Sequence, residues 1–281
     1  MSRAELFVGS LLNAVARPAP ALAGRMAFAL FRNPVRRGKV LPAERAVHER
    51  ATTEELTVNG KRVRVYRWGT GERPVLLVHG WQSRASRYAA FVPYLEALGL
   101  TPVSFDAPGH GSSGGRATTI LEYREIIGRL QRTYGAFHSV VAHSLGATGA
   151  LLALRGEVKT GRLVTVAAVK DFGHFPDEFA RILGLGEGLR EDLRDRTEHR
   201  LFAEVTAPWE EFDATCRPEE IDVPMLIIHD TDDDMVPVAQ ARALKAAHGD
   251  RAELVVTSGL GHRKILAEPA IVDTALEFIA R

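Results

Sequence analysis

The chain has 281 residues, of which 46% are hydrophobic and 25% are charged, a composition typical of a folded globular protein and unlike that of a disordered one. Its 36 basic and 35 acidic side chains leave a net charge of +1, which excludes a general polyanion binder, so we expect no nucleic-acid partner. The single cysteine, Cys216, excludes an intramolecular disulfide and a cysteine-rich zinc site and favours a reducing, cytoplasmic location.

Residues 1–50 form an N-terminal helical extension with a composition of its own. Short apolar runs alternate with prolines and arginines, and none approaches the ~20 apolar residues that span a bilayer. We predict two short amphipathic helices that pack on the body of the protein. Four basic residues without matching acids follow them (Arg32, Arg36, Arg37 and Lys39). A weak contact with an anionic membrane surface, or a dimer contact, is therefore an alternative interpretation of this segment.

From residue 54 onward the pattern is that of alternating strands and helices. Residues 56–58 and 63–66 flank Asn59-Gly60 and predict a β-hairpin. Continuous apolar runs then predict strands that are buried on both faces of a mostly parallel sheet. The predicted strands are residues 75–78, 102–105, 138–142, 163–167, 224–229 and 253–256, and the predicted helices are residues 88–98, 118–132, 145–155, 238–247 and a last one from about 263. This order predicts an α/β fold, with a doubly wound, mostly parallel sheet and an antiparallel N-terminal hairpin.

The alternation breaks between residues 170 and 221. Pro176 suits the first turn of a helix, whose apolar face is predicted to carry Phe175, Phe179, Ile182 and Leu183. An insertion at about residues 171–220 would emerge beside the crevice where open α/β sheets bind ligands. We therefore predict a small helical cap within a domain of residues 54–281, with Phe175 and Phe179 as substrate contacts. The alternative is that this apolar face only packs the cap onto the sheet.

Ser144 lies between a predicted strand and a predicted helix, in the sequence Ala142-His143-Ser144-Leu145-Gly146. A serine at such a sharp turn projects its hydroxyl above the sheet, and small neighbouring residues avoid clashes there. The amide N–H of Leu145 opens a helix and can bind a developing oxyanion. Ala142 replaces the first glycine of the G-x-S-x-G pattern, and alanine is small enough for the position to tolerate it. We predict that Ser144 is a nucleophile; the alternative is a helix cap.

A serine nucleophile needs a base, and His262 is the candidate. It lies between the last predicted strand and the last predicted helix, next to Gly261. Imidazole can accept the serine proton near neutral pH and return it to the leaving group. The alternative is a surface or helix-capping histidine.

The base needs a carboxylate, and four aspartates follow the strand at residues 224–229 (Asp230, Asp232, Asp233 and Asp234). We predict that Asp233, four residues before Pro237, orients His262 and stabilises the imidazolium. The other three are predicted to be solvated turn or helix-start carboxylates, and Asp171 is a less favoured acid. An EF-hand is excluded because Met235 replaces the required glycine and Ala241 the closing glutamate, so we expect no metal.

The chain order Ser144, Asp233, His262 is that of the α/β-hydrolase triad. Over residues 54–281 the sequence resembles the α/β-hydrolase superfamily, and the matching segments are residues 77–81, 105–113, 142–146, 233–237 and 261–262. The resemblance implies a second oxyanion donor in the backbone N–H of Trp81. The Trp81 indole and Gln82 are further candidates for substrate contact.

The expected activity is cleavage of a carboxylic ester of a small, partly apolar substrate through an acyl-enzyme at Ser144, with no cofactor. Alternatives on the same triad are thioesterase, C–C bond hydrolase, acyltransferase and peptidase activity. A non-catalytic α/β-hydrolase fold that binds a ligand is an alternative of another class. A serine rather than an aspartate at the nucleophile position argues against the haloalkane dehalogenase and epoxide hydrolase branches.

Overall fold

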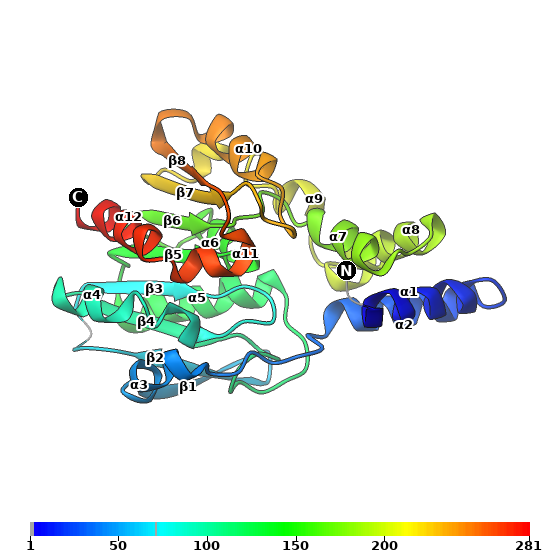
Figure 1. Ribbon diagram of the computed structural model, residues 1–281, viewed down its shortest axis with the longest axis horizontal. Coiled ribbons are helices and arrows are strands. Elements are labelled where there is room, and N and C mark those ends of the chain that lie inside the picture. Colours follow the sequence, from blue (N-terminus) through cyan, green and yellow to red (C-terminus); the bar gives the residue numbers. More distant parts are fainter. Residues whose placement is uncertain (1–2, 71) are drawn as a thin grey trace. The chain divides into compact units, whose positions relative to one another are not determined.

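The computed structural model describes residues 3–70 and 72–281 and divides the chain into two compact units (Figure 1). Arg36–Lys170 and Ala214–Arg281 form one unit, called the sheet unit here. The chain up to Val35 joins Asp171–Asp213 in the other, called the helical unit. Among the helices of the described residues, none has the length and apolar character needed to cross a membrane.

The sheet unit contains one eight-stranded sheet in the order β1-β2-β4-β3-β5-β6-β7-β8. The strands are β1 (Thr52–Val58), β2 (Lys61–Arg67), β3 (Pro74–Val78), β4 (Thr101–Asp106), β5 (Ser139–His143), β6 (Leu163–Val166), β7 (Met225–Asp230) and β8 (Ala252–Thr257). β2 pairs antiparallel with β1 and β4, and the pairs from β4 to β8 are parallel. The predicted fold class and N-terminal hairpin are thus confirmed. Asn59 and Gly60 adopt φ 47° and 71°, the left-handed values that a tight two-residue hairpin turn requires.

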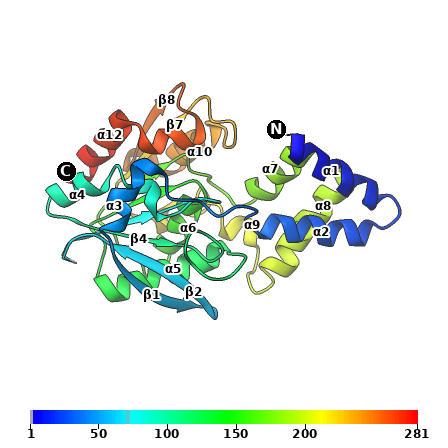
Figure 2. The same ribbon diagram turned by 60° about the horizontal axis from the view of Figure 1, so that its bottom comes forward.

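Helices cover both faces of this sheet (Figures 1 and 2). The helices of the sheet unit are α3 (Arg45–Glu49), α4 (Val92–Ala97), α5 (Ile120–Tyr134), α6 (Leu145–Leu154), α10 (Ala239–His248), α11 (Gly261–Lys264) and α12 (Pro269–Ala280), with short 3₁₀ turns between them. Apolar side chains of α4 and α12 share one buried cluster with alternate residues of β3, β5, β6 and β7. α5, α6 and α10 lie on the opposite face. Burial on both faces explains why these strands are continuous apolar runs.

The C-terminal helix differs from its prediction. Instead of one helix from about residue 263, the chain forms α11, a 3₁₀ turn at Ile265–Ala267 and then α12, which begins at Pro269. Glu268 has an extended backbone with ψ 123°. A proline ring disfavours the helical conformation of the residue before it, so Pro269 ends one helix and begins the next.

The helical unit combines two segments that are far apart in sequence. Its main helices are α1 (Arg3–Ala16), α2 (Pro20–Arg32), α7 (His174–Leu183) and α8 (Glu187–Arg196), followed by a π-helical turn at Thr197–Leu201 and the short α9 (Pro208–Glu211). α1 packs on α2 and α7, and α8 packs on α2 and α7. The buried residues of their common core are Leu12, Ala23, Ala27, Leu183 and Leu189. The two predicted N-terminal helices therefore exist, and within this unit their partners are the helices of the insertion.

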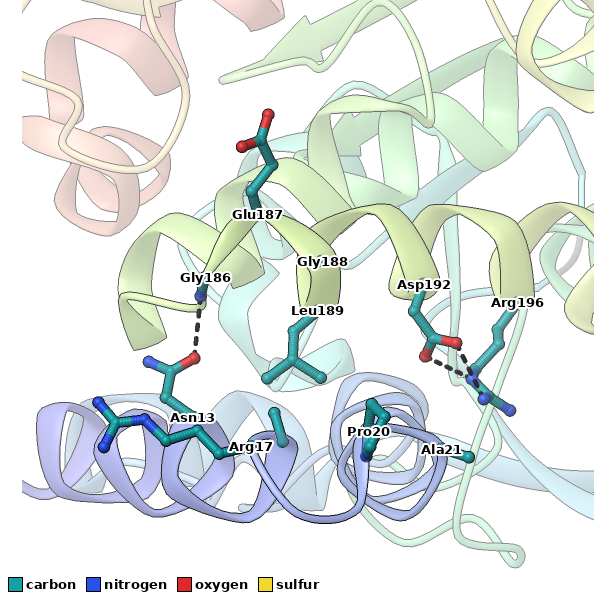
Figure 3. A pocket seen from close by; sticks show the side chains of 11 residues that line it. Asn13, Arg17, Pro20, Ala21, Gly186, Glu187, Gly188, Leu189, Asp192 and Arg196 are labelled. Atoms are coloured by element: carbon teal, nitrogen blue, oxygen red, sulfur yellow. Dashed lines mark hydrogen bonds and ion pairs between the residues drawn. The ribbon is translucent and has the colours of Figure 1, made fainter.

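Figure 3 shows how α8 faces α1 and α2. Leu189 points from α8 toward the N-terminal helices, where it is 5% exposed. The Asn13 side chain accepts a 2.9 Å hydrogen bond from the Gly186 N–H and donates one of 2.8 Å to the Gly184 oxygen. One amide thus ties α1 to the turn between α7 and α8. Asn13, Gly186 and Leu189 are among the residues that line an open cavity of about 620 Å³.

The predicted apolar face of α7 has two sets of neighbours within the helical unit. The Phe175 ring lies 5.1 Å from that of Phe172, which contacts Phe202 at 4.9 Å. Phe179 instead lies 5.5 Å from Phe31, beside the core shared with α1 and α2. Both phenylalanines therefore take part in packing inside this unit.

Candidate active site

Ser144 is the single residue between β5 and α6, and its backbone is strained. Its φ of 54° and ψ of −125° are values that L-residues rarely adopt. Such conformations cost about 1–3 kcal/mol and persist where the surrounding structure imposes them, most often at functional sites. Here the Ser144 N–H donates a 3.0 Å hydrogen bond to the Val166 oxygen of β6, which fixes the turn to the sheet.

Two glycines allow backbone to pass directly beside this turn. A Cβ on Gly146 would lie 2.4 Å from the Val78 oxygen and 2.5 Å from the His79 oxygen. A Cβ on Gly80 would lie 2.9 Å from the Ser144 Cβ. The loop that follows β3 is therefore pressed against both α6 and the serine, which explains the need for glycine at both positions.

The Ser144 hydroxyl belongs to a continuous chain of hydrogen bonds. The Ser144 Oγ lies 3.0 Å from His262 Nε2, and His262 Nδ1 lies 2.7 Å from Asp233 Oδ2. The side chains are nearly buried, with 6% exposure for Ser144 and 7% for His262. The structure thus brings together the three residues that the sequence analysis selected, in the order hydroxyl, imidazole, carboxylate.

Asp233 is held in place on the side away from the histidine. Its Oδ1 accepts hydrogen bonds of 2.9 Å and 2.8 Å from the N–H groups of Met235 and Val236. Burial alone would raise the pKa of Asp233, but the hydrogen bond and positive charge of His262, together with these two amides, outweigh burial and lower the pKa. The carboxylate is therefore ionised at neutral pH and can stabilise an imidazolium.

Asp230 corrects one prediction, because it is not a solvated turn carboxylate. It is fully buried at the end of β7, with an exposed fraction of 0%. Its Oδ1 accepts from the Gly261 N–H at 3.0 Å, and its Oδ2 accepts from the Thr257 hydroxyl at 2.7 Å and the Leu260 N–H at 3.2 Å. The physical reason is that the Leu260 and Gly261 amides, in the loop with His262, lie at the end of β7 and need a buried acceptor. Asp230 therefore positions the backbone next to the histidine.

His143 supports His262 from the other side. Its Nε2 lies 2.8 Å from the His262 carbonyl oxygen, and the two rings are 4.9 Å apart. Burial, followed by the nearby charge of His262, lowers the pKa of His143 to about 3. His143 is therefore neutral, and its Nε2–H donates to the carbonyl. The sequence analysis did not predict this contact for His143, which is the last residue of β5.

The loop after β3 is anchored by buried polar groups. His79 Nε2 accepts a 2.9 Å hydrogen bond from the Ala107 N–H, and burial lowers the pKa of His79, so that it stays neutral. Asp106 accepts from the Ala85 N–H at 2.9 Å and from the Ser112 N–H at 2.7 Å. These bonds join the loops that follow β3 and β4. The sequence motif around Asp106 was noticed, but this anchoring role was not.

The remaining candidate residues lie in three places. Leu145 begins α6, and the amides of a first helical turn have no partner within the helix. Trp81 and Gln82 are half-buried in the loop after β3, with the Trp81 ring 5.1 Å from that of His110. Phe175 and Phe179 belong to the helical unit. Asp171, the less favoured acid, accepts a 3.1 Å hydrogen bond from the His174 N–H at the start of α7.

Within residues 3–70 and 72–281, no group of three or more histidine, cysteine, aspartate or glutamate side chains is arranged to hold a metal ion. The polar groups around Ser144 instead hydrogen-bond to one another and to the backbone. What this arrangement can do chemically is to move a proton from the serine hydroxyl to the imidazole, which turns the hydroxyl into a nucleophile.

The fold and this site define the class of protein. A model described as the alpha/beta hydrolase family matches residues 75–275, so the chain belongs to that family. Esterase YjfP of Escherichia coli strain K12 is 27% identical over 225 residues, which are 73% of this chain and 86% of that protein. Relatives of this kind support hydrolase activity.

Solved structures show the same fold. A monoacylglycerol lipase from Paleococcus ferrophilus superimposes with a TM-score of 0.60 and 22% identity, covering 78% of this chain and 98% of that one. A bacterial protein described as a membrane phospholipase A gives a TM-score of 0.61 with 17% identity and 96% coverage of both chains.

Proposed function

We propose that this chain is a serine hydrolase that cleaves a carboxylic ester of a small, partly apolar substrate through an acyl-enzyme at Ser144. The observation that carries the proposal is the hydrogen-bond chain from Ser144 Oγ through His262 to Asp233, with links of 3.0 Å and 2.7 Å. The esterase and lipase names of the similar proteins agree with it.

The proposed first step is attack of Ser144 Oγ on the ester carbonyl carbon. His262 Nε2 takes the hydroxyl proton, and Asp233 stabilises the imidazolium through Nδ1–H. The carbonyl π electrons move to oxygen and give a tetrahedral oxyanion. The protonated His262 then gives its proton to the alcohol oxygen as the C–O bond breaks, which leaves an acyl group on Ser144.

In the second step a water molecule attacks the acyl carbon. His262 again removes a proton, and the collapse of the second tetrahedral species returns the proton to Ser144 Oγ and releases the carboxylic acid. The reaction consumes one ester and one water and yields one acid and one alcohol. It needs no redox partner.

The backbone N–H groups of Trp81 and Leu145 are the proposed oxyanion donors. Two features support them: the start of α6 immediately follows the serine, and Gly80 packs against the Ser144 Cβ. The loss of one such donor typically costs about 3 kcal/mol of transition-state stabilisation. Contacts of substrate with Trp81, Gln82, Phe175 and Phe179 stay predictions.

The test is labelling by a fluorophosphonate probe together with turnover of short p-nitrophenyl esters. We expect the wild-type protein to be labelled at Ser144, and Ser144→Ala to lose both the label and about 10⁶-fold in kcat. Ser10→Ala, which removes an exposed hydroxyl in α1, is the control and should behave as wild type. Turnover by Ser144→Ala at the wild-type rate would remove Ser144 from the mechanism. Preferred turnover of acyl thioesters in a matched panel would replace the ester assignment.

A further inference from the structure

Large apolar side chains are exposed together on α1 and α2 of the helical unit. Phe7 is 72% exposed, Leu11 49%, Leu6 and Leu22 44% each, and Met26 36%. Isolated exposed apolar residues are common on protein surfaces, but contiguous groups mark interaction sites.

On each helix the exposed apolar residues follow helical spacing. Ala4, Phe7, Leu11 and Ala14 of α1 recur at intervals of three and four residues and are all exposed, as are Leu22, Met26 and Ala29 of α2. Residues at this spacing lie along one side of a helix. α1 and α2 therefore each have two apolar sides, one buried and one exposed.

The buried sides fix the direction of the exposed ones. Leu12 of α1 and Ala23 and Ala27 of α2 are buried in the core shared with α7 and α8. α1 and α2 also pack against each other, so they form a layer over the insertion helices (Figures 1 and 2). The stripes opposite the buried sides thus face away from α7 and α8 on one common outer surface, which we name the outer face (Phe7, Leu11, Leu22 and Met26).

The charge around the outer face is positive. Residues 3–33, which include α1 and α2, contain four basic residues and a single acidic one, Glu5. Within the helical unit, Arg17, Arg25 and Arg32 are exposed, and Arg25 and Arg32 flank the apolar stripe of α2. α2 contains no acidic residue.

An apolar stripe bordered by arginines fits one occupant, the surface of an anionic lipid bilayer. Phe and Leu side chains can enter the boundary between headgroups and acyl chains, while arginines bind the phosphate groups above it. A second copy of the chain fits less well, since a two-fold interface would set this positive surface against itself. We infer that the outer face of α1 and α2 is a membrane-docking surface for anionic lipid.

The test is co-sedimentation of the full-length protein with vesicles of pure phosphatidylcholine and of phosphatidylcholine with phosphatidylglycerol. We expect binding to the anionic vesicles, weakened by added NaCl because screening acts on the arginine–phosphate attraction. Phe7→Ser with Leu11→Ser should lower the partition coefficient by about tenfold or more, and Arg25→Glu with Arg32→Glu should do the same.

Two matched controls separate docking from general surface effects. Tyr94→Ser with Leu98→Ser removes apolar side chains that are 55% and 44% exposed in the sheet unit, and Arg132→Glu with Arg242→Glu reverses two exposed charges there. Both should bind anionic vesicles like the wild type. Hydrolysis of a soluble ester and the circular dichroism spectrum should be unchanged in every variant, which shows that the fold is intact.

Three outcomes would overturn the inference. One is equal binding to both kinds of vesicle or none to either. Another is an equal loss in the control variants. The third is a wild-type dimer, measured by analytical ultracentrifugation without lipid, that Phe7→Ser with Leu11→Ser converts into a monomer; the outer face would then be a contact between copies.

A Phe7→Trp variant gives a second readout, because its fluorescence should shift to the blue with anionic vesicles only.

Discussion

At the scale of single residues, three aspartates at the end of β7 and in the loop after it have different tasks. Asp233 hydrogen-bonds to His262, while Asp230 is buried beneath the same loop and accepts from Gly261 and Leu260. Asp232 accepts a 2.7 Å hydrogen bond from the Gly259 N–H and is exposed. One carboxylate therefore binds the side chain of His262, and two others bind backbone N–H groups of the loop that contains it.

Asp230 leads to a prediction about stability and pH. Burial by itself would raise the pKa of this carboxyl, but hydrogen bonds from Thr257 and from backbone amides lower it below the ordinary value of 3.8. A group whose pKa is lower in the folded state stabilises the fold above its unfolded pKa and loses that effect as the pH falls through the folded value. In Asp230→Asn, an amide NH₂ group takes the place of Oδ2 and cannot accept the hydrogen bonds that Oδ2 receives from Thr257 and Leu260.

We therefore expect Asp230→Asn to lower the free energy of unfolding by about 1.5–3 kcal/mol at pH 7. The difference from wild type should shrink as the pH falls below 3.8, because the carboxyl is then protonated first in the unfolded chain and only at lower pH in the folded protein. Urea unfolding over a series of pH values measures it, and Asp250→Asn, at an exposed position of the sheet unit, should match the wild type. A difference that is constant at every pH would mean that the charge of Asp230 has no part in stability.

Sequence reasoning could select the three residues of the hydrogen-bond chain but not the groups that support them. Ser144, Asp233 and His262 stand at strand ends in recognisable local patterns, and strand ends of a parallel sheet meet at one edge. Asp230 differs from the neighbouring aspartates in being buried. The role of His143 depends on its contact with the His262 carbonyl oxygen. Both properties depend on where residues 259–262 lie relative to the end of β7, and no local sequence pattern predicts that position.

At the scale of secondary-structure elements, the position of α6 depends on a glycine, Gly146, which has no side chain. Gly146 allows α6 to approach the loop after β3 so closely that a Cβ would meet two carbonyl oxygens, at 2.4 Å and 2.5 Å. Gly188 of α8 is also a helical glycine, yet a Cβ there would meet nothing within 4 Å. The same substitution at these two positions therefore compares packing with helix propensity.

We predict opposite effects for the two substitutions. Gly146→Ala should destabilise the protein by about 1–3 kcal/mol and slow fluorophosphonate labelling, since backbone must shift next to Ser144. Gly188→Ala should stabilise it by about 0.5–1 kcal/mol, because alanine loses less backbone entropy in a helix. Chemical denaturation and labelling rates measure both effects. Equal stability changes in the two variants would contradict the close approach at Gly146.

Strands and most helices of the sheet unit could be predicted because their signals are local. A buried parallel strand shows a continuous apolar run, and Thr119 with Glu122 caps the start of α5 through reciprocal hydrogen bonds that the sequence spacing allows. The break at Pro269 was missed, although proline gives a local signal, because the apolar pattern continues on both sides of it.

At the scale of the whole molecule, the helical unit joins residues more than 130 positions apart. The first helices could be predicted from their amphipathic pattern, but their partners could not, because an apolar stripe fits any other apolar stripe of similar size. α1 and α2 contribute Leu12, Ala23 and Ala27 to a core whose other half comes from Leu183 and Leu189. The insertion helices thus obtain part of their core from the N-terminal segment.

This arrangement predicts that a disruptive core substitution in α1 increases local unfolding of α7 and α8. Leu12 is 1% exposed in the shared core, whereas the adjacent Leu11 is 49% exposed. Leu12→Asp would bury an unpaired carboxylate, which costs several kcal/mol unless the helices separate. We expect faster amide hydrogen exchange throughout α7 and α8 in this variant, while β3, β5 and β7 of the sheet unit keep their protection. Leu11→Asp has the same chemistry one position away and should leave exchange in α7 and α8 unchanged. If α7 and α8 stayed protected in Leu12→Asp, the insertion helices would hold their structure without the N-terminal segment.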